Sequence, residues 1–190
     1  MNIIIQEDKS DKYPPRTYFN AKSADITLAL AIDMDTFGEK LTHKAAGEKY
    51  IGFLLEENTN GIEIAQKVIE FMKEKKAKSM NIAGNGIYTF AQKGYSQEHI
   101  NAFVCDIIEH VHQHYGIEKI YTGGQTGVDL AGAISAEYLK IPGQITLPKG
   151  YRQRLENGKD ILQTKEDVEK NIEYYTNILL KEDKKRLKIR

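Results

Sequence analysis

The chain has 190 residues, of which 41% are hydrophobic and 28% are charged, as is ordinary for a globular protein of one or at most two domains. Its 27 Lys and Arg residues balance its 27 Asp and Glu residues, and this zero net charge argues against binding duplex nucleic acid through a broad cationic surface. The single cysteine, Cys105, excludes an intramolecular disulfide framework and a Cys-rich zinc site. No apolar run is long enough to span a membrane, and the acidic start does not fit a signal peptide, so we expect a cytoplasmic protein.

The N-terminal part alternates between apolar runs and polar segments. We expect strands at residues 1–6 and 49–55. The apolar run at 26–33 fits either a buried strand or a short helix, and its periodicity does not choose between them. Residues 7–24 are polar and contain a Pro-Pro pair, so we interpret them as a loop.

Strands and helices alternate through the rest of the chain. Helical periodicity is found at residues 61–76, between Ser96 and Gly116, at 128–140 and at 168–179, and the last helix dissolves into a solvated basic tail at 184–190. Strands are expected at residues 79–83, 118–122 and 144–147, and residues 151–163 form an excursion. This alternation predicts an α/β fold of the Rossmann-like, three-layer kind, with a mostly parallel sheet to which the N-terminal segment adds edge strands. Because the connections are short, we expect residues 1–190 to form one domain.

Glycine-rich turns follow two of the predicted strands, and a Pro-Lys-Gly sequence follows a third. Ligands of open parallel sheets bind outside the carboxyl ends of the strands, where glycines allow close backbone approach and a helix N-terminus favours an anion. This placement predicts a phosphate site, with Lys149 as a compensating cation; the alternative is that the glycines only make tight turns. The predicted ligand-binding residues are Gly84, Asn85, Gly86, Thr122, Gly123, Gly124, Gln125, Thr126, Gly127, Lys149 and Gly150.

Several polar side chains near these turns have two interpretations. Asp129, in the first turn of the helix after the glycine loop, either braces that loop or contacts a ligand hydroxyl or a water as a general base. Tyr88, Gln97 and Asn101 either bind the edge of a base or pterin or face solvent.

The acidic run after residue 32 is also ambiguous. Asp33, Asp35 and Glu39 have the oxygen ligands that Mg²⁺ prefers, and they would equally suit ribose hydroxyls. The simpler interpretation is a helix start, because Thr36 and Glu39 have the spacing of a capping box. If the run is functional, Asp33 and Glu39 are the first candidates.

The segment Tyr121-Thr-Gly-Gly-Gln-Thr-Gly-Val-Asp-Leu-Ala-Gly132, with Leu147-Pro-Lys-Gly150 and Asn157-Gly158 downstream, resembles the molybdenum-cofactor carrier proteins. These belong to the SLOG group of Rossmann-like proteins, whose relatives include the LONELY GUY (lysine-decarboxylase-like) phosphoribohydrolases and the DprA-type proteins. The resemblance covers roughly residues 80–180. It implies that the loop from Gly123 to Gly127 holds the phosphate of a nucleotide-like ligand, and that the protein forms a homo-oligomer. The Pro-Gly-Gly-x-Gly-Thr-x-x-Glu motif of the phosphoribohydrolases is absent.

The function expected from these features is binding of a phosphorylated, nucleotide-like small molecule, such as a nucleotide or an ADP-ribose-type or molybdopterin-type ligand. One alternative is a hydrolase of such compounds that uses Asp129 or Glu39 as its catalytic residue. A second alternative is an interaction protein without a ligand. Mg²⁺ and a molybdopterin-type group are the candidate cofactors, and no residue is assigned as a metal ligand.

Overall fold

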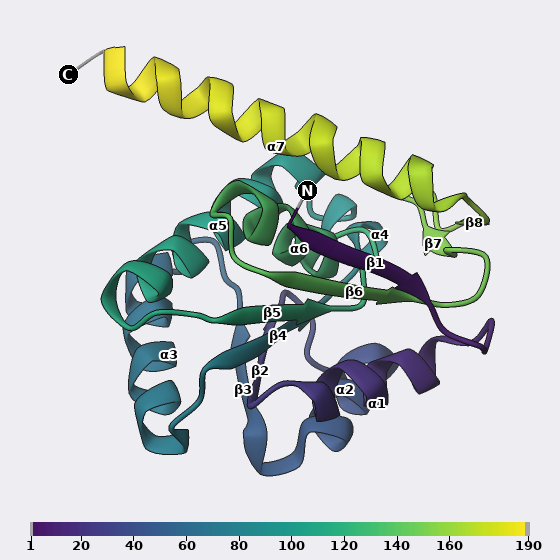
Figure 1. Cartoon of the computed structure of the whole chain (residues 1–190), viewed down its shortest axis with the longest axis horizontal. Helices are drawn as coiled ribbons and strands as arrows, with labels where there is room; N and C mark the ends of the chain where they lie inside the picture. Colours follow the sequence, from purple (N-terminus) through teal and green to yellow (C-terminus); the bar gives the residue numbers. More distant parts are fainter. Residues whose placement is uncertain (1, 189–190) are drawn as a thin grey trace.

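The computed structural model describes residues 2–188, and the side chains of residues 2–182 (Figure 1). The first half contains β1 (Ile3–Glu7), α1 (Tyr13–Ser23), β2 (Ile26–Ala31), α2 (Phe37–Ala46), β3 (Tyr50–Leu54) and α3 (Gly61–Lys75), with a 3₁₀ turn at Gly47–Lys49. The second half contains β4 (Ser79–Gly84), α4 (Ile87–Ala91), α5 (Gln97–His114), β5 (Lys119–Thr122), α6 (Val128–Tyr138), β6 (Gly143–Leu147), β7 (Gln153–Arg154), β8 (Asp160–Ile161) and α7 (Lys165–Lys188). None of the described helices is long and apolar enough to cross a membrane.

Six strands form a sheet in the order β1-β6-β5-β4-β2-β3, and every neighbouring pair is parallel. The predicted Rossmann-like α/β class is therefore confirmed. The N-terminal segment supplies both edge strands, β1 and β3, and also the interior strand β2. All six residues of β2 are buried, as expected of a strand covered on both faces, and the short-helix interpretation of residues 26–33 is wrong.

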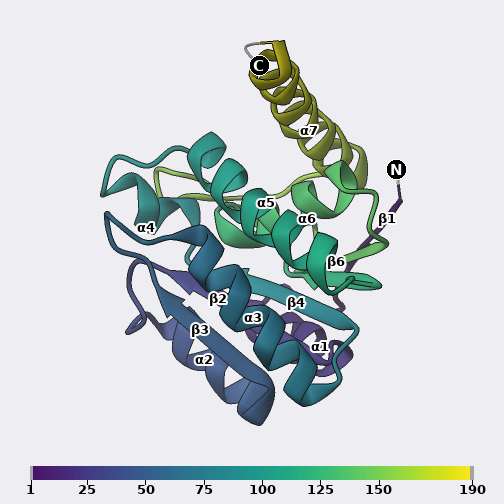
Figure 2. The ribbon, with the colours of Figure 1, turned by 90° about the vertical axis from the view of Figure 1, so that its left-hand side faces the viewer.

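Helices cover the two faces of the sheet unequally. α3, α5 and α6 lie side by side on one face, and α1 and α2 pack together on the other (Figure 2). Side chains alternate between the faces along each strand. The first face therefore receives Ile26, Leu28 and Leu30 of β2 and Met80 and Ile82 of β4, all in one apolar cluster. The face under α1 and α2 receives the residues between them: Thr27, Ala29 and Ala31 of β2 and Asn81 and Ala83 of β4.

The loop predicted for residues 7–24 is wrong, because α1 occupies Tyr13–Ser23. The Pro-Pro pair that suggested a loop lies in the first turn of the helix. There the missing N–H groups of proline have no helical partner to lose, and the fixed proline φ suits the helix. α1 buries Arg16, Asn20 and Ala21, so a charged residue and an amide occupy its inner face.

Other local predictions have mixed outcomes. Ser96 caps α5 as expected, with a reciprocal bond to the side chain of His99. The short helix α4 was not expected, and the excursion at 151–163 contains the small antiparallel hairpin of β7 and β8. The backbone of α7 continues to Lys188, beyond the predicted end of the last helix, and the predicted solvated tail at 184–190 lies outside the described side chains.

The helices that follow two neighbouring strands lie on opposite faces of the sheet. β2 leads to α2 on one face of the sheet, whereas its neighbour β4 leads to α4 and α5 on the other. Such a switch point at the carboxyl ends of parallel strands is where open α/β sheets hold their ligands. The side-chain amide of Asn85, just after β4, joins the two strand ends, since its Oδ1 accepts from the N–H groups of Ile32 and Asp33 at 2.9 Å each.

Candidate functional site

A cavity of about 390 Å³ opens at the carboxyl edge of the sheet, between the N-terminal ends of α1 and α2. We call it the α1–α2 cavity. The turns after β4 and β5 border it, Arg154 of the hairpin lies at its edge, and Asn81 and Ala83 of β4 form part of its lining. Its volume lies within the roughly 300–1,000 Å³ typical of small-molecule sites. The wall of the cavity includes Arg16, Asn20 and Thr42.

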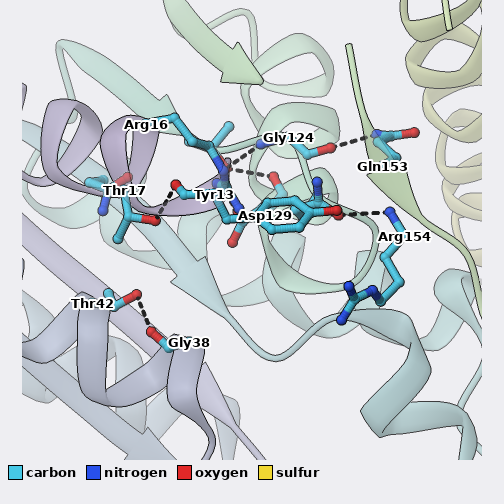
Figure 3. A network of polar contacts seen from close by, with 12 residues as sticks. Tyr13, Arg16, Thr17, Gly38, Thr42, Gly124, Asp129, Gln153 and Arg154 are labelled. Atoms are coloured by element: carbon cyan, nitrogen blue, oxygen red, sulfur yellow. Dashed lines mark hydrogen bonds and ion pairs between the residues drawn. The ribbon is translucent and has the colours of Figure 1, made fainter. Parts of the chain in front are cut away.

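The centre of the site is a buried ion pair that joins α1 to α6. Arg16 Nη1 lies 2.8 Å from Asp129 Oδ2, and the two side chains are only 10% and 8% exposed (Figure 3). A Cβ atom on Gly123 would overlap the Arg16 guanidinium and lie 2.4 Å from Asp129 Oδ2, so a side chain here would displace the ion pair. Arg16 is the principal cation of the site, and it is not among the predicted site residues because its segment was interpreted as a loop. The spacing of Arg16 and Asn20, one helical turn apart, is the signal that would have found this inner face.

Asp129 also satisfies the backbone of the glycine turns. Its carboxylate accepts hydrogen bonds from the N–H groups of Gln125 and Gly84, in addition to the Arg16 guanidinium. Burial raises the pKa of Asp129, and the Arg16 guanidinium opposes that rise. The bracing role considered for Asp129 is therefore present in the structure. A carboxylate of the protein itself takes up backbone donors near the start of α6, where the sequence analysis placed a ligand phosphate.

Two of the glycines are explained by packing within the turns. A Cβ atom on Gly84 would lie 2.1 Å from the carbonyl oxygen of Leu30. Gly127 has a φ of +93° and its Cβ position lies 2.4 Å from the carbonyl oxygen of Asn85. Glycine at 84 thus lets the end of β4 lie close to β2, and glycine at 127 lets the turn after β5 lie close to the turn after β4.

The structure brings six of the predicted residues to the cavity and places the others behind it or away from it. Its lining contains Gly84, Gly86, Gly123, Gln125, Thr126 and Asp129. Asn85, Thr122, Gly124 and Gly127 hold the turns in place through hydrogen bonds to neighbouring backbone or side chains. Lys149 is exposed and is not part of the lining, and Gly150 donates its N–H to Glu7 at 2.6 Å. Arg16 stands where the sequence analysis expected the cation to be Lys149.

Glu39 departs from the simple capping interpretation. Thr36 caps α2 by accepting from the N–H of Glu39. The Glu39 side chain turns inward instead of closing the box, is 3% exposed, and lies 3.5 Å from the Asn85 amide nitrogen. Burial, together with the nearby Asp129 and Asp33 carboxylates, raises the pKa of Glu39 to about 8. Glu39 therefore carries a proton at neutral pH.

The three carboxylates considered as an alternative Mg²⁺ site do not converge on one point. Asp35 pairs with Lys40 at 3.0 Å, Asp33 accepts the N–H of Asp35, and Glu39 is buried. Among the residues that the structure describes, no group of three or more His, Cys, Asp or Glu side chains is arranged to hold a metal ion.

Buried amide groups around the α1–α2 cavity have incomplete hydrogen bonding. In the described part of the chain, the Nδ2 and Oδ1 atoms of Asn20, the Oδ1 atom of Asn81 and the Nε atom of Arg16 have no hydrogen-bond partner. Such groups are rare in native proteins, and each requires an explanation such as a ligand or water. The aromatic ring of Tyr13 lies beside them, with the guanidinium carbons of Arg16 and Arg154 each 5.7 Å from its centre.

A wider groove of about 930 Å³ adjoins the cavity, and Tyr88 and Thr126 line both. We call it the amide groove, because its lining includes Gln92, Gln153, Asn157, Gln163 and Asn171. Gln97 also lines it, but its amide is committed to Asn101 and to both backbone groups of Gly127. Gln97 and Asn101 are buried and support the turn, so neither faces solvent as one interpretation held.

The fold and the cavity define the class of protein first: a Rossmann-like α/β protein with a polar cavity at the switch point of a parallel sheet. More particularly, the chain belongs to the circularly permutated YpsA SLOG family, whose family model matches residues 3–97, half of the chain. The SLOG membership inferred from the sequence is thus confirmed. The match spans β1 to the start of α5 and includes α1 and α2, whereas the resemblance in the sequence began near residue 80. No match is found among curated proteins.

Proposed function

We propose that this protein binds a phosphorylated, nucleotide-like small molecule in the α1–α2 cavity. The observation that carries the proposal is the lining: Arg16, Asn20 and Asn81 contribute to it, and each has a buried polar atom that no hydrogen bond within the described residues satisfies. Membership of the SLOG family supports nucleotide-related ligands in general.

The phosphate end of the ligand belongs at the mouth of the cavity. The first turn of α2 contributes Phe37 and Gly38 to the lining, and free N–H groups at a helix start favour an anion. The turns at Gly84–Gly86 and Gly123–Thr126 border the same space. Arg154, whose side chain is half exposed, adds a guanidinium at the edge, and its Nε donates to Asp160 Oδ1 at 2.8 Å, so that carboxylate balances part of its charge. Arg16 neutralises the charge of Asp129, so the carboxylate does not repel a phosphate as a free anion would.

The amide groove sets how long the ligand can be. The α1–α2 cavity, at about 390 Å³, has the size of a site for a small ligand such as a nucleoside monophosphate. A longer ligand of the ADP-ribose or molybdopterin type would pass between Tyr88 and Thr126 into the amide groove, whose lining contains no Lys or Arg and one carboxylate, Glu156, and therefore suits uncharged polar groups better than a second phosphate. The resemblance to molybdenum-cofactor carriers supports including a pterin ligand among those tested.

Hydrolysis of the bound ligand has less support. Burial raises the pKa of Glu39 to about 8, but Glu39 is not part of the lining of the α1–α2 cavity, and a general acid must lie within hydrogen-bond reach of the group that it protonates. Asp129 suits the role of general base poorly, because Arg16 and two backbone N–H groups already occupy its carboxylate. Glu39→Gln should therefore leave the affinity for the ligand unchanged.

Thermal unfolding with added ligand tests the proposal directly. AMP, ADP-ribose and a pterin phosphate, each with and without Mg²⁺, should raise the melting temperature, since a ligand at 100 times its Kd stabilises by about 2.7 kcal/mol. Arg154→Ala should weaken phosphate ligands roughly tenfold without unfolding the exposed hairpin, whereas the matched surface variant Lys93→Ala should not. Chromatography of the incubated ligand separates binding from hydrolysis. If no phosphorylated compound shifts the transition, the interaction-protein alternative replaces this proposal.

A further inference from the structure

The deep end of the α1–α2 cavity contains two buried asparagines from different elements. Asn20 of α1 is 2% exposed and Asn81 of β4 is 3% exposed. Asn81 Nδ2 donates to Thr27 Oγ1 at 3.2 Å, which leaves its Oδ1 as an acceptor. Within the described residues neither Oδ1 nor Nδ2 of Asn20 is paired. Leaving buried polar groups unpaired destabilises the fold, so two unpaired amides at this place indicate a hydrogen-bond partner from outside the chain.

The two asparagines lie at a defined depth below the mouth. Asn20 is four residues along α1 from Arg16, a rise of about 6 Å. Asn81 is three residues before Gly84 on β4, a distance of about 10 Å along an extended strand. A ribose separates the phosphate of a nucleotide from its base by a similar length. A ligand with its phosphate at the mouth therefore presents its base to Asn20 and Asn81.

The unpaired atoms form a donor and acceptor pattern. Asn20 offers one donor group and one acceptor, and Asn81 offers a second acceptor. An exocyclic amino group beside an unprotonated ring nitrogen complements this pattern: its two hydrogens go to the two Oδ1 atoms, and Asn20 Nδ2 donates to the ring nitrogen. Asparagine pairs with adenine through the same bidentate geometry in nucleic-acid recognition. An oxo group at that position would instead place a third acceptor against two acceptors.

We infer that the deep end of the cavity selects bases that carry an amino group next to a ring nitrogen, as adenine and cytosine do, through Asn20 and Asn81. This inference rests on the proposed function and specifies its ligand class. Asn20 and Asn81 are specificity-determining residues in this account. A site built to pair with an amino group rejects the oxo analogue strongly, because the analogue leaves buried polar groups unpaired.

Calorimetric titration of the full chain with four nucleotides tests the inference. AMP against IMP, and CMP against UMP, each exchange the amino group for an oxo group. The amino compound of at least one pair should bind ten or more times tighter, and the two pairs distinguish a purine from a pyrimidine site. Asn20→Leu should abolish that preference and weaken the amino nucleotide at least tenfold, while ribose 5-phosphate keeps its wild-type affinity. Asn58→Leu, at an exposed loop position, is the matched control and should change nothing.

The folding of Asn20→Leu is itself informative. The substitution removes two unpaired polar atoms, keeps the number of side-chain heavy atoms, and borders a cavity that can take the extra volume of the methyl groups, so its melting temperature should equal or exceed that of the wild type. Equal affinities within both nucleotide pairs would overturn the inference, as would equal weakening of AMP and IMP by Asn20→Leu. If ribose 5-phosphate binds and the nucleotides bind no tighter, only the inference fails. If none of the five compounds binds, and ADP-ribose and the pterin phosphate also fail to bind, the proposed function fails with it.

Discussion

The two faces of the sheet are built from the same strands and differ in almost everything else. The face under α3, α5 and α6 receives the large apolar residues of β2 and β4, which are buried in one continuous cluster. The face under α1 and α2 receives Thr27, Asn81 and alanines, and it holds the cavity and Arg16, which pairs with Asp129 of α6 from the other face. Alternation along a strand gives each face its own composition. One face can therefore supply stability while the other keeps buried polar groups beside a cavity.

The largest expected effect on the polar face comes from leaving Asp129 without its cation. Arg16→Met should lower the free energy of unfolding by about 3–5 kcal/mol, because an unpaired charge would remain buried. Adding Asp129→Asn to that variant should recover much of the loss, since the amide carries no charge and still accepts backbone N–H groups. Urea denaturation of both single variants and the double variant measures the coupling. Additive losses would show that the ion pair does not govern the stability of this face.

Neighbouring positions of β4 give the sharpest comparison between the faces. Ile82→Ala removes a fully buried side chain of the apolar cluster and should cost about 2–5 kcal/mol. Asn81→Ala, one residue earlier and equally enclosed, should cost about 1 kcal/mol or less, because it loses one hydrogen bond and borders an existing cavity. Equal losses in urea denaturation would mean that the polar face is as tightly packed as the apolar one.

The polar face should also make stability depend on pH. Glu39 has a folded pKa of about 8, raised from 4.5, so the folded state binds its proton more tightly than the unfolded chain does. Its favourable contribution is complete below the unfolded pKa and is lost as the pH rises toward 8. Between pH 6 and pH 9 the loss should be on the order of 2–3 kcal/mol. Glu39→Gln should flatten this dependence, and an unchanged slope in the variant would assign it to other groups.

The smallest effect should come from Lys149, which lies outside both the cavity and the amide groove. Lys149→Ala should change the free energy of unfolding by less than about 0.5 kcal/mol, as is usual for an exposed position. It should change the affinity for AMP less than twofold, whereas Arg154→Ala should change it about tenfold. A large loss of affinity in Lys149→Ala would restore the sequence-based assignment of this residue to the phosphate site.

Native mass spectrometry of the same samples measures whether the protein forms the expected homo-oligomer.

The parts of the site that local chemistry governs were predictable. Gly84, Gly123 and Gly127 stand out because they follow predicted strands, where tight strand-to-helix turns favour glycine; the distant atoms that a Cβ would meet there, such as Leu30 O and the Arg16 guanidinium, are visible only in the fold. Asp129 stood out by its place in the first turn of a helix. The alternation of apolar runs and helical periodicity predicted the parallel sheet for the same reason, since both signals are contained within short windows of sequence.

The parts that depend on distant partners were not predictable. A polar segment with two prolines fits both a loop and the start of α1, and only packing against the sheet makes it a helix. Arg16 is buried because it meets Asp129, which lies 113 residues further along the chain. Glu39 has the spacing of a capping box, yet its side chain turns to Asn85, 46 residues away.

The sequence by itself determined the fold class, the order of strands and helices along most of the chain, and the glycine-rich turns that border the α1–α2 cavity. Tertiary structure decided the order of the strands in the sheet, which face α1 and α2 cover, and hence which polar residues are buried together. The physical reason is that the period of a strand or helix and the conformation of a turn are set by neighbouring residues. The burial of Arg16, Asn20, Glu39 and Asn81 is set by contacts that exist only once the helices have packed against the sheet.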